Sequence, residues 1–123
     1  MDSDKNNPSL DHTAVIVFIT TGSTDEAKKI GKLLVEEGLA ACSTIIQPVV
    51  SIFKWKDAIH VEQETLVISK TRQELFNALE KRVKQLHSYE VPEIIAIPIT
   101  QGSKSYLDWI VKETQDTLVI GSE

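Results

Sequence analysis

Hydrophobic and polar positions along the chain predict strands that alternate with helices. Residues 14–20 form a continuous, mostly β-branched apolar run, which is typical of a central strand covered on both faces. Ser23 and Glu26 then form a capping box, and apolar residues recur at helical spacing as far as Gly38, which predicts a helix over residues 24–37. The folded part of the chain therefore begins with a strand followed by a helix.

The next segment predicts a long hairpin and a second helix. The pattern is extended over residues 39–55 and again over 59–70, with a short polar turn at 56–58 between them. Thr71 and Glu74 form a second capping box, which predicts the start of a helix. One face of this helix carries apolar residues at helical spacing: Leu75, Phe76, Leu79, Val83 and Leu86.

A hinge over residues 87–99 combines backbone constraints with polar chemistry. Because a residue before proline avoids helical geometry, Val91 indicates that the second helix has already ended. Pro92 and Pro98 cannot donate backbone hydrogen bonds, so the strand predicted over residues 93–99 should be short or lie at a sheet edge. A third helix, carrying several aromatic residues, is predicted before the C-terminal tail.

The order strand, helix, strand, strand, helix, strand and final helix predicts an α+β fold, a ferredoxin-like split βαβ sandwich with helices on one face of an antiparallel sheet. Apolar groups nevertheless occupy both faces, because Val67 alternates with Leu66 and Ile68. An unbroken strand over 39–53 would stretch roughly 50 Å, against a diameter of about 35 Å for a compact chain of this size. The strand must bend at Pro48 or project into a neighbour, so we predict an obligate homo-oligomer.

Composition limits the class of protein. The 123 residues suit one domain, and 41% hydrophobic and 25% charged residues are ordinary for a globular protein. A net charge of −5 without a basic stripe argues against a nucleic-acid partner. Apolar runs far shorter than a bilayer span and a polar segment 1–12 without a secretory signal predict a cytoplasmic protein with no membrane partner. We expect a flexible arm over 1–12, a folded domain over 13–115 and a tail over 116–123 with a possible short strand.

The candidate metal ligands are few. His87 and Glu90 are three residues apart, so an imidazole and a carboxylate could reach one copper or other divalent ion. The alternative is a histidine that caps the helix. Cys42 is the only cysteine, which excludes an internal disulfide, and it is either a buried apolar residue or a copper(I) ligand facing a subunit cleft with His87.

Further polar and aromatic residues are candidates for a cleft between subunits or for structural roles. Glu64 could pair with Lys70 or with a neighbour, and Lys70 could reach an anion or a carboxylate in such a cleft. Trp55 would be exposed near the hairpin tip of a lone subunit, so burial against a partner explains it best. The full set is Ser51, Trp55, Glu64, Lys70, Tyr89, Glu93, Tyr106 and Trp109.

Five blocks of sequence, in this order and spacing, resemble the CutA family of divalent-cation tolerance proteins. The blocks are residues 39–42, 51–55, 70–71, 87–95 and 106–110, and the resemblance runs from about Val15 to Thr114. It implies a ferredoxin-like subunit, a tight homotrimer similar in architecture to the PII signalling proteins, and a role in tolerance of copper and other divalent metals.

Several positions depart from the family pattern that the resemblance implies. Ser88 stands where a proline is common, Phe53 where a tyrosine is frequent, and Asp57 where a glycine is common in the turn. Ile19 and Leu86 occupy the places of a cysteine and a second histidine that are suggested as copper ligands in some members. Of that set only His87 remains.

The sequence therefore predicts a non-enzymatic, cytoplasmic homotrimer that binds copper or another divalent metal ion weakly in clefts near His87, Glu90 and Cys42. One alternative is a PII-like signalling module that holds a small metabolite or partner protein in the clefts, although no Gly-rich phosphate loop is present. A hydrolase or thiol enzyme is a third alternative, and it lacks an orienting third residue at recognisable spacing.

Overall fold

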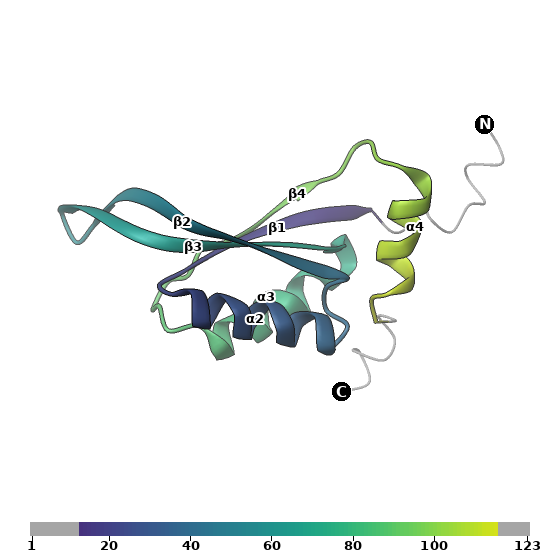
Figure 1. Ribbon diagram of the computed structural model, residues 1–123, viewed down its shortest axis with the longest axis horizontal. Coiled ribbons are helices and arrows are strands. Elements are labelled where there is room, and N and C mark those ends of the chain that lie inside the picture. Colours follow the sequence, from purple (N-terminus) through teal and green to yellow (C-terminus); the bar gives the residue numbers. More distant parts are fainter. Residues whose placement is uncertain (1–12, 116–123) are drawn as a thin grey trace.

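The structure, a computed structural model, describes residues 13–115, whose arrangement Figure 1 shows. The arm predicted over 1–12 and the strand predicted within 116–123 lie outside the described residues. In chain order the elements are β1 (Ala14–Thr21), α2 (Thr24–Glu36), β2 (Cys42–Trp55), β3 (Ala58–Arg72), the 3₁₀ turn η2 (Gln73–Leu75), α3 (Phe76–Leu86), β4 (Ile94–Pro98) and α4 (Lys104–Lys112).

The four strands form one antiparallel sheet in the order β2-β3-β1-β4. Helices α2 and α3 lie on one face of this sheet, and α4 lies at one of its ends (Figure 1). This arrangement confirms the predicted α+β, ferredoxin-like fold with helices on one face of the sheet. β4 is an edge strand, as the prolines around it predict.

The hairpin of β2 and β3 projects beyond the rest of the sheet (Figure 1). Its register shifts between Ile46 and Val49, so the bend predicted at Pro48 coincides with a β-bulge. The turn consists of two residues with left-handed backbone, Lys56 at φ 51° and Asp57 at φ 66°. Such turns match the twist of the flanking strands, and they hold the hairpin in one register out to its tip.

One predicted capping box is confirmed and the other is wrong. At the start of α2, Ser23 Oγ accepts a hydrogen bond from the Glu26 N–H (3.1 Å). Thr71, by contrast, still belongs to β3, and its buried hydroxyl donates to the Leu39 carbonyl (2.7 Å). A buried carbonyl needs a donor, and Thr71 meets that need instead of capping a helix. The chain enters α3 through the turn η2, which begins without a side-chain cap.

Burial alternates along β1, because helices cover only one face of the sheet within a single chain. Val15, Val17 and Ile19 belong to the main hydrophobic core, whereas Ile16 and Phe18 point to the other face and are only partly buried. This corrects the expectation that β1 is covered on both faces. We call the uncovered side of the sheet the open face; its apolar residues are Ile16, Phe18, Ile46, Leu66, Ile68, Ile95 and Ile97.

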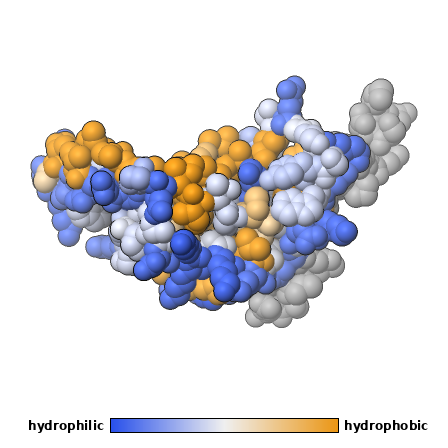
Figure 2. Space-filling view, in the orientation of Figure 1, coloured by the Kyte–Doolittle hydropathy of each residue, from blue (hydrophilic) through white to orange (hydrophobic). Residues whose placement is uncertain are grey.

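A second uncovered apolar surface lies on the projecting hairpin. We call it the hairpin patch, and its side chains are between 64% and 70% exposed: Val50, Ile52, Ile59 and Val61. Ile52 and Val61 are direct cross-strand partners. Figure 2 shows hydrophobic residues gathered on the hairpin and along the sheet on the side away from the helices. A single chain thus exposes apolar surface on two connected parts of one sheet.

Candidate functional site

His87 ends α3 and turns its fully buried ring toward the end of β1. The ring Nε2 donates to the Thr20 carbonyl (2.7 Å), and Nδ1 accepts from the Tyr89 N–H (3.1 Å). A carbonyl can only accept and a backbone N–H can only donate, so these bonds define the neutral ring protonated at Nε2. A metal ion needs the lone pair of Nδ1, and binding one there would displace the Tyr89 N–H.

The carboxylate beside His87 belongs to Glu26 of α2, and Glu90 is exposed in the hinge. Glu26 accepts from the Ser88 N–H (2.7 Å) and the Ser88 hydroxyl (3.1 Å), and its Oε2 lies 3.7 Å from His87 Nδ1. Burial acts to raise the pKa of Glu26, but the two bonds from Ser88 outweigh it and leave the pKa below its ordinary value. Glu26 thus fastens the start of α2 to the hinge.

We expect Glu26→Gln to lower the free energy of unfolding by about 1 kcal/mol at neutral pH, because it weakens two charge-assisted hydrogen bonds from Ser88. The folded-state pKa of Glu26 is depressed, so its stabilisation is complete above the ordinary glutamate range and is lost as pH falls through the folded-state pKa. Urea denaturation at neutral pH and at about pH 3 should therefore give a difference that shrinks on acidification. A difference that grows would contradict this role, and the exposed Glu90→Gln serves as the control.

Tyr89 and Glu64 form the second contact of the hinge. The Tyr89 hydroxyl donates to Glu64 Oε2 at 2.6 Å, and Glu64 is only 7% exposed. Burial raises the pKa of the Tyr89 phenol, and the hydrogen bond to Glu64 and the nearby charges of Glu26 and Glu62 raise it further. Glu64 therefore pairs with the hinge, and the suggested pairing of Glu64 with Lys70 is not what the structure shows.

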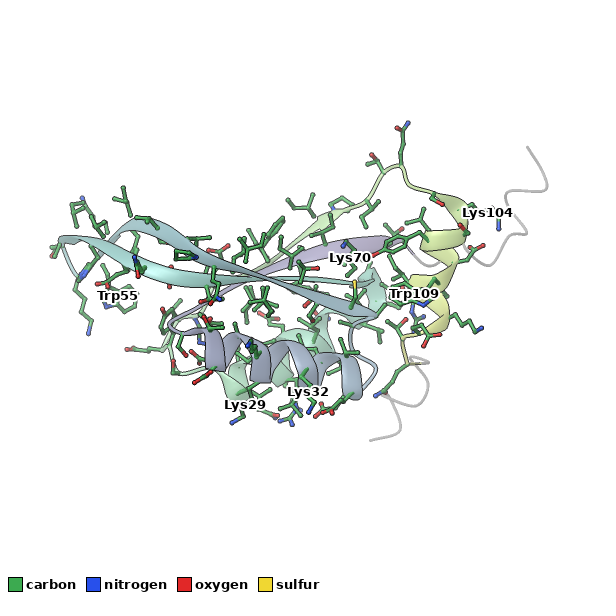
Figure 3. The ribbon with its side chains drawn as sticks, viewed as in Figure 1. Lys29, Lys32, Trp55, Lys70, Lys104 and Trp109 are labelled. Atoms are coloured by element: carbon green, nitrogen blue, oxygen red, sulfur yellow. The ribbon has the colours of Figure 1, made fainter. Side chains whose placement is uncertain are left out.

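Cys42 lies in a different part of the molecule, with Lys70 and two aromatic residues of α4. Cys42 and Lys70 are cross-strand partners, and Cys42 Sγ lies 3.6 Å from the Tyr106 hydroxyl. The Lys70 Nζ is 5.8 Å from the centre of the Tyr106 ring, which stacks on Trp109 at 5.5 Å. Figure 3 shows Lys70 and Trp109 at the same end of the sheet. His87 contacts Thr20, near the opposite end of β1 from the Lys70 partner Ile16, so one chain does not bring Cys42 and His87 together.

The remaining predicted residues lie along the hairpin and beside β4. Ser51 faces Glu62 across the hairpin, and Glu93 is exposed just before β4. Trp55 is 39% exposed at the hairpin tip (Figure 3), with the Lys56 Nζ 5.8 Å from its ring centre. Within residues 13–115 no three His, Cys, Asp or Glu side chains are grouped as a metal site. The predicted cleft residues thus occupy separate places on a single chain.

Comparison with known proteins decides the family. Residues 15–113 match the family described as "CutA1 divalent ion tolerance protein". The chain belongs to this family. It is 46% identical over 99 residues to the divalent-cation tolerance protein CutA of Thermus thermophilus, which covers 80% of this chain and 96% of that protein. The crystal structure of the Thermus thermophilus protein superposes with a TM-score of 0.81 at 44% identity, covering 83% of this chain and 99% of that one.

A plant member of the family is longer than the chain. The chain is 37% identical over 115 residues to the Arabidopsis thaliana "Protein CutA, chloroplastic", which covers 94% of this chain and 60% of the plant protein. Among residues 13–115, no helix is long and apolar enough to cross a membrane. The family resemblance drawn from the five sequence blocks is confirmed, and the cytoplasmic location stays a prediction.

Proposed function

We propose that this chain acts in divalent-cation tolerance as a cytoplasmic, non-enzymatic homotrimer that binds copper or another divalent ion weakly in clefts between subunits. The observation that supports the assembly is the apolar surface that one chain leaves uncovered, on the open face and on the hairpin patch. Contiguous apolar patches of this kind mark interaction sites in soluble proteins. A second copy of the chain is the simplest cover, and the family resemblance makes the number three.

The hairpin supplies the geometry for such an assembly. It projects beyond the core, so its patch cannot pack against its own helices (Figure 1). A hairpin that reaches a neighbouring subunit would bury Ile52, Val61 and Trp55, and would carry Ser51 and Glu62 toward that neighbour's hinge. Clefts formed in this way would bring together residues that lie apart on one chain. The mass of the assembly in solution tests this part of the proposal.

Weak metal binding follows from the geometry of the candidate ligands. His87 must give up its bond from the Tyr89 N–H before Nδ1 can take an ion, and Glu26 is the carboxylate closest to that nitrogen among its described contacts. Cys42 and Glu90 could join only from another subunit. Two ligands from one chain make an incomplete site for copper or zinc, which take about four.

Calorimetric titration with copper(II) and zinc tests the metal part of the proposal. We expect His87→Ala to weaken binding at least tenfold, because the ring nitrogen is the only imidazole ligand at the hinge. The matched control is His60→Ala, which removes an imidazole that stacks on Phe53 in the hairpin, and it should leave the affinity within twofold. Unchanged affinity in His87→Ala would remove His87 from the site, and a loss confined to His60→Ala would move the site to the hairpin.

A further inference from the structure

A polar cavity lies in the corner between the base of the hairpin and the start of α2. Its volume is about 360 Å³, which suits a small organic ligand better than a single ion. The described residues that line it include one ionisable side chain, Glu64; the complete lining is Gly22, Ser23, Thr24, Gln47, Pro48, Gln63, Glu64 and Thr65. The cavity therefore has a negative wall without a positive residue among its lining.

Glu64 is held in place with one oxygen left free. The residue is 7% exposed, and its Oε2 accepts the hydroxyl of Tyr89 at 2.6 Å. Its Oε1 makes no hydrogen bond or ion pair with residues 13–115. Since no buried side-chain oxygen of the described residues lacks a partner, Oε1 must be accessible to solvent, and the cavity that Glu64 lines supplies that access. A carboxylate anchored in this way is preorganised to accept a bond from a ligand.

The rest of the cavity wall offers neutral oxygen acceptors. The Thr24 hydroxyl donates to the side-chain oxygen of Gln47 and lies 3.4 Å from the Thr65 hydroxyl, so these groups form one polar wall. Gln63 adds a second amide. The charges of Glu26 and Glu62 also act on Tyr89, which shows that the surroundings of Glu64 are negative.

We propose that this cavity binds a small organic cation through a primary ammonium group, with Glu64 as its counter-ion. An ammonium group carries three donors, and one carboxylate oxygen with two neutral oxygens satisfies them. A divalent metal ion takes six or more oxygen ligands, or several anionic ones, and the wall provides one carboxylate. The proposal goes beyond the tolerance function and does not rest on it, because it involves neither His87 nor a bound metal.

The test uses the full chain, with n-butylammonium and tetramethylammonium as probes of equal charge. Tetramethylammonium has no N–H donor, so it serves as the control for charge alone. We expect n-butylammonium to shift the backbone amide resonances of Gln63 and Thr65 in a saturable way, and tetramethylammonium to bind at least tenfold more weakly. Absence of saturable shifts up to tens of millimolar, or equal binding of both probes, would overturn the proposal.

Three variants assign the site to Glu64. Glu64→Gln should weaken n-butylammonium binding at least tenfold, whereas Glu62→Gln, which removes the same charge two residues away on the same strand, should change it less than twofold. Tyr89→Phe keeps the carboxylate and should retain binding, which separates loss of the ligand from loss of the fold. Equal losses in Glu62→Gln and Glu64→Gln would contradict a specific site. Magnesium or copper shifting the same amides with the same dependence on Glu64, while n-butylammonium does not, would also overturn the proposal.

Discussion

Replacing Ile52 and Val61 by glutamate will convert the assembly into single chains at micromolar concentration. The two side chains are cross-strand partners on the hairpin patch, where both are at least 64% exposed in one chain. In the proposed homotrimer they lie against a neighbour, and two carboxylates buried there without partners cost several kcal/mol. Size-exclusion chromatography with light scattering should give the mass of one chain for the double variant.

Lys29→Glu is the matched control for this experiment, because it changes the net charge by the same amount. Lys29 is exposed on α2, on the side of the molecule away from the sheet (Figure 3). The control should keep the assembled mass. Dissociation of both proteins would mean that net charge, and not the hairpin patch, governs the assembly. An Ile52→Glu/Val61→Glu protein that stays assembled would exclude the patch from the interface.

Ile19→Ala should lower the free energy of unfolding by about 3 kcal/mol, the second large effect that we expect. Ile19 is 0% exposed in the centre of β1, and it belongs to the hydrophobic core under α2 and α3 with Ile30 and Leu34. Truncating it leaves a cavity that the surrounding helices can fill only in part. Urea denaturation followed by circular dichroism measures the change, and a cost below about 1 kcal/mol would contradict this packing.

Phe18→Ala distinguishes the two faces of the same strand. Phe18 is adjacent to Ile19 in sequence but lies on the open face, opposite Ile68 and Ile95. We expect its removal to raise the protein concentration at which the assembly dissociates, while the helical signal of the folded chain is kept. Sedimentation over a range of concentrations checks this. A loss of fold equal to that of Ile19→Ala, with no change in assembly, would mean that the open face is not an interface.

The periodic parts of the fold could be predicted from the sequence, because local patterns govern them. The apolar run of β1, the capping box of α2 and the proline-flanked edge strand β4 all depend on neighbours within a few residues. Thr71 was misassigned because its partner, the carbonyl of Leu39, is remote in sequence. The left-handed backbone of Lys56 has no residue-type signal, since lysine seldom adopts it.

The contacts of the hinge could be predicted only in part, for the same reason. His87 and Glu90 would lie near each other if the helix continued, but the backbone at His87 is already extended (ψ 141°). The partners that His87 acquires, Thr20 and the neighbouring carboxylate of Glu26, come from segments more than 60 residues away. Glu26 could be recognised from the sequence as a capping residue, and no spacing rule links it to the hinge.

The mass of the native protein is the most direct measure of how the open face and the hairpin patch are covered. Sedimentation equilibrium of the full chain at micromolar concentration should give about three times the 13.7 kDa of one chain, with no dissociation on dilution toward the nanomolar range. A folded species of 13.7 kDa would contradict the account, because the apolar surface would then lie exposed to water without another copy to cover it.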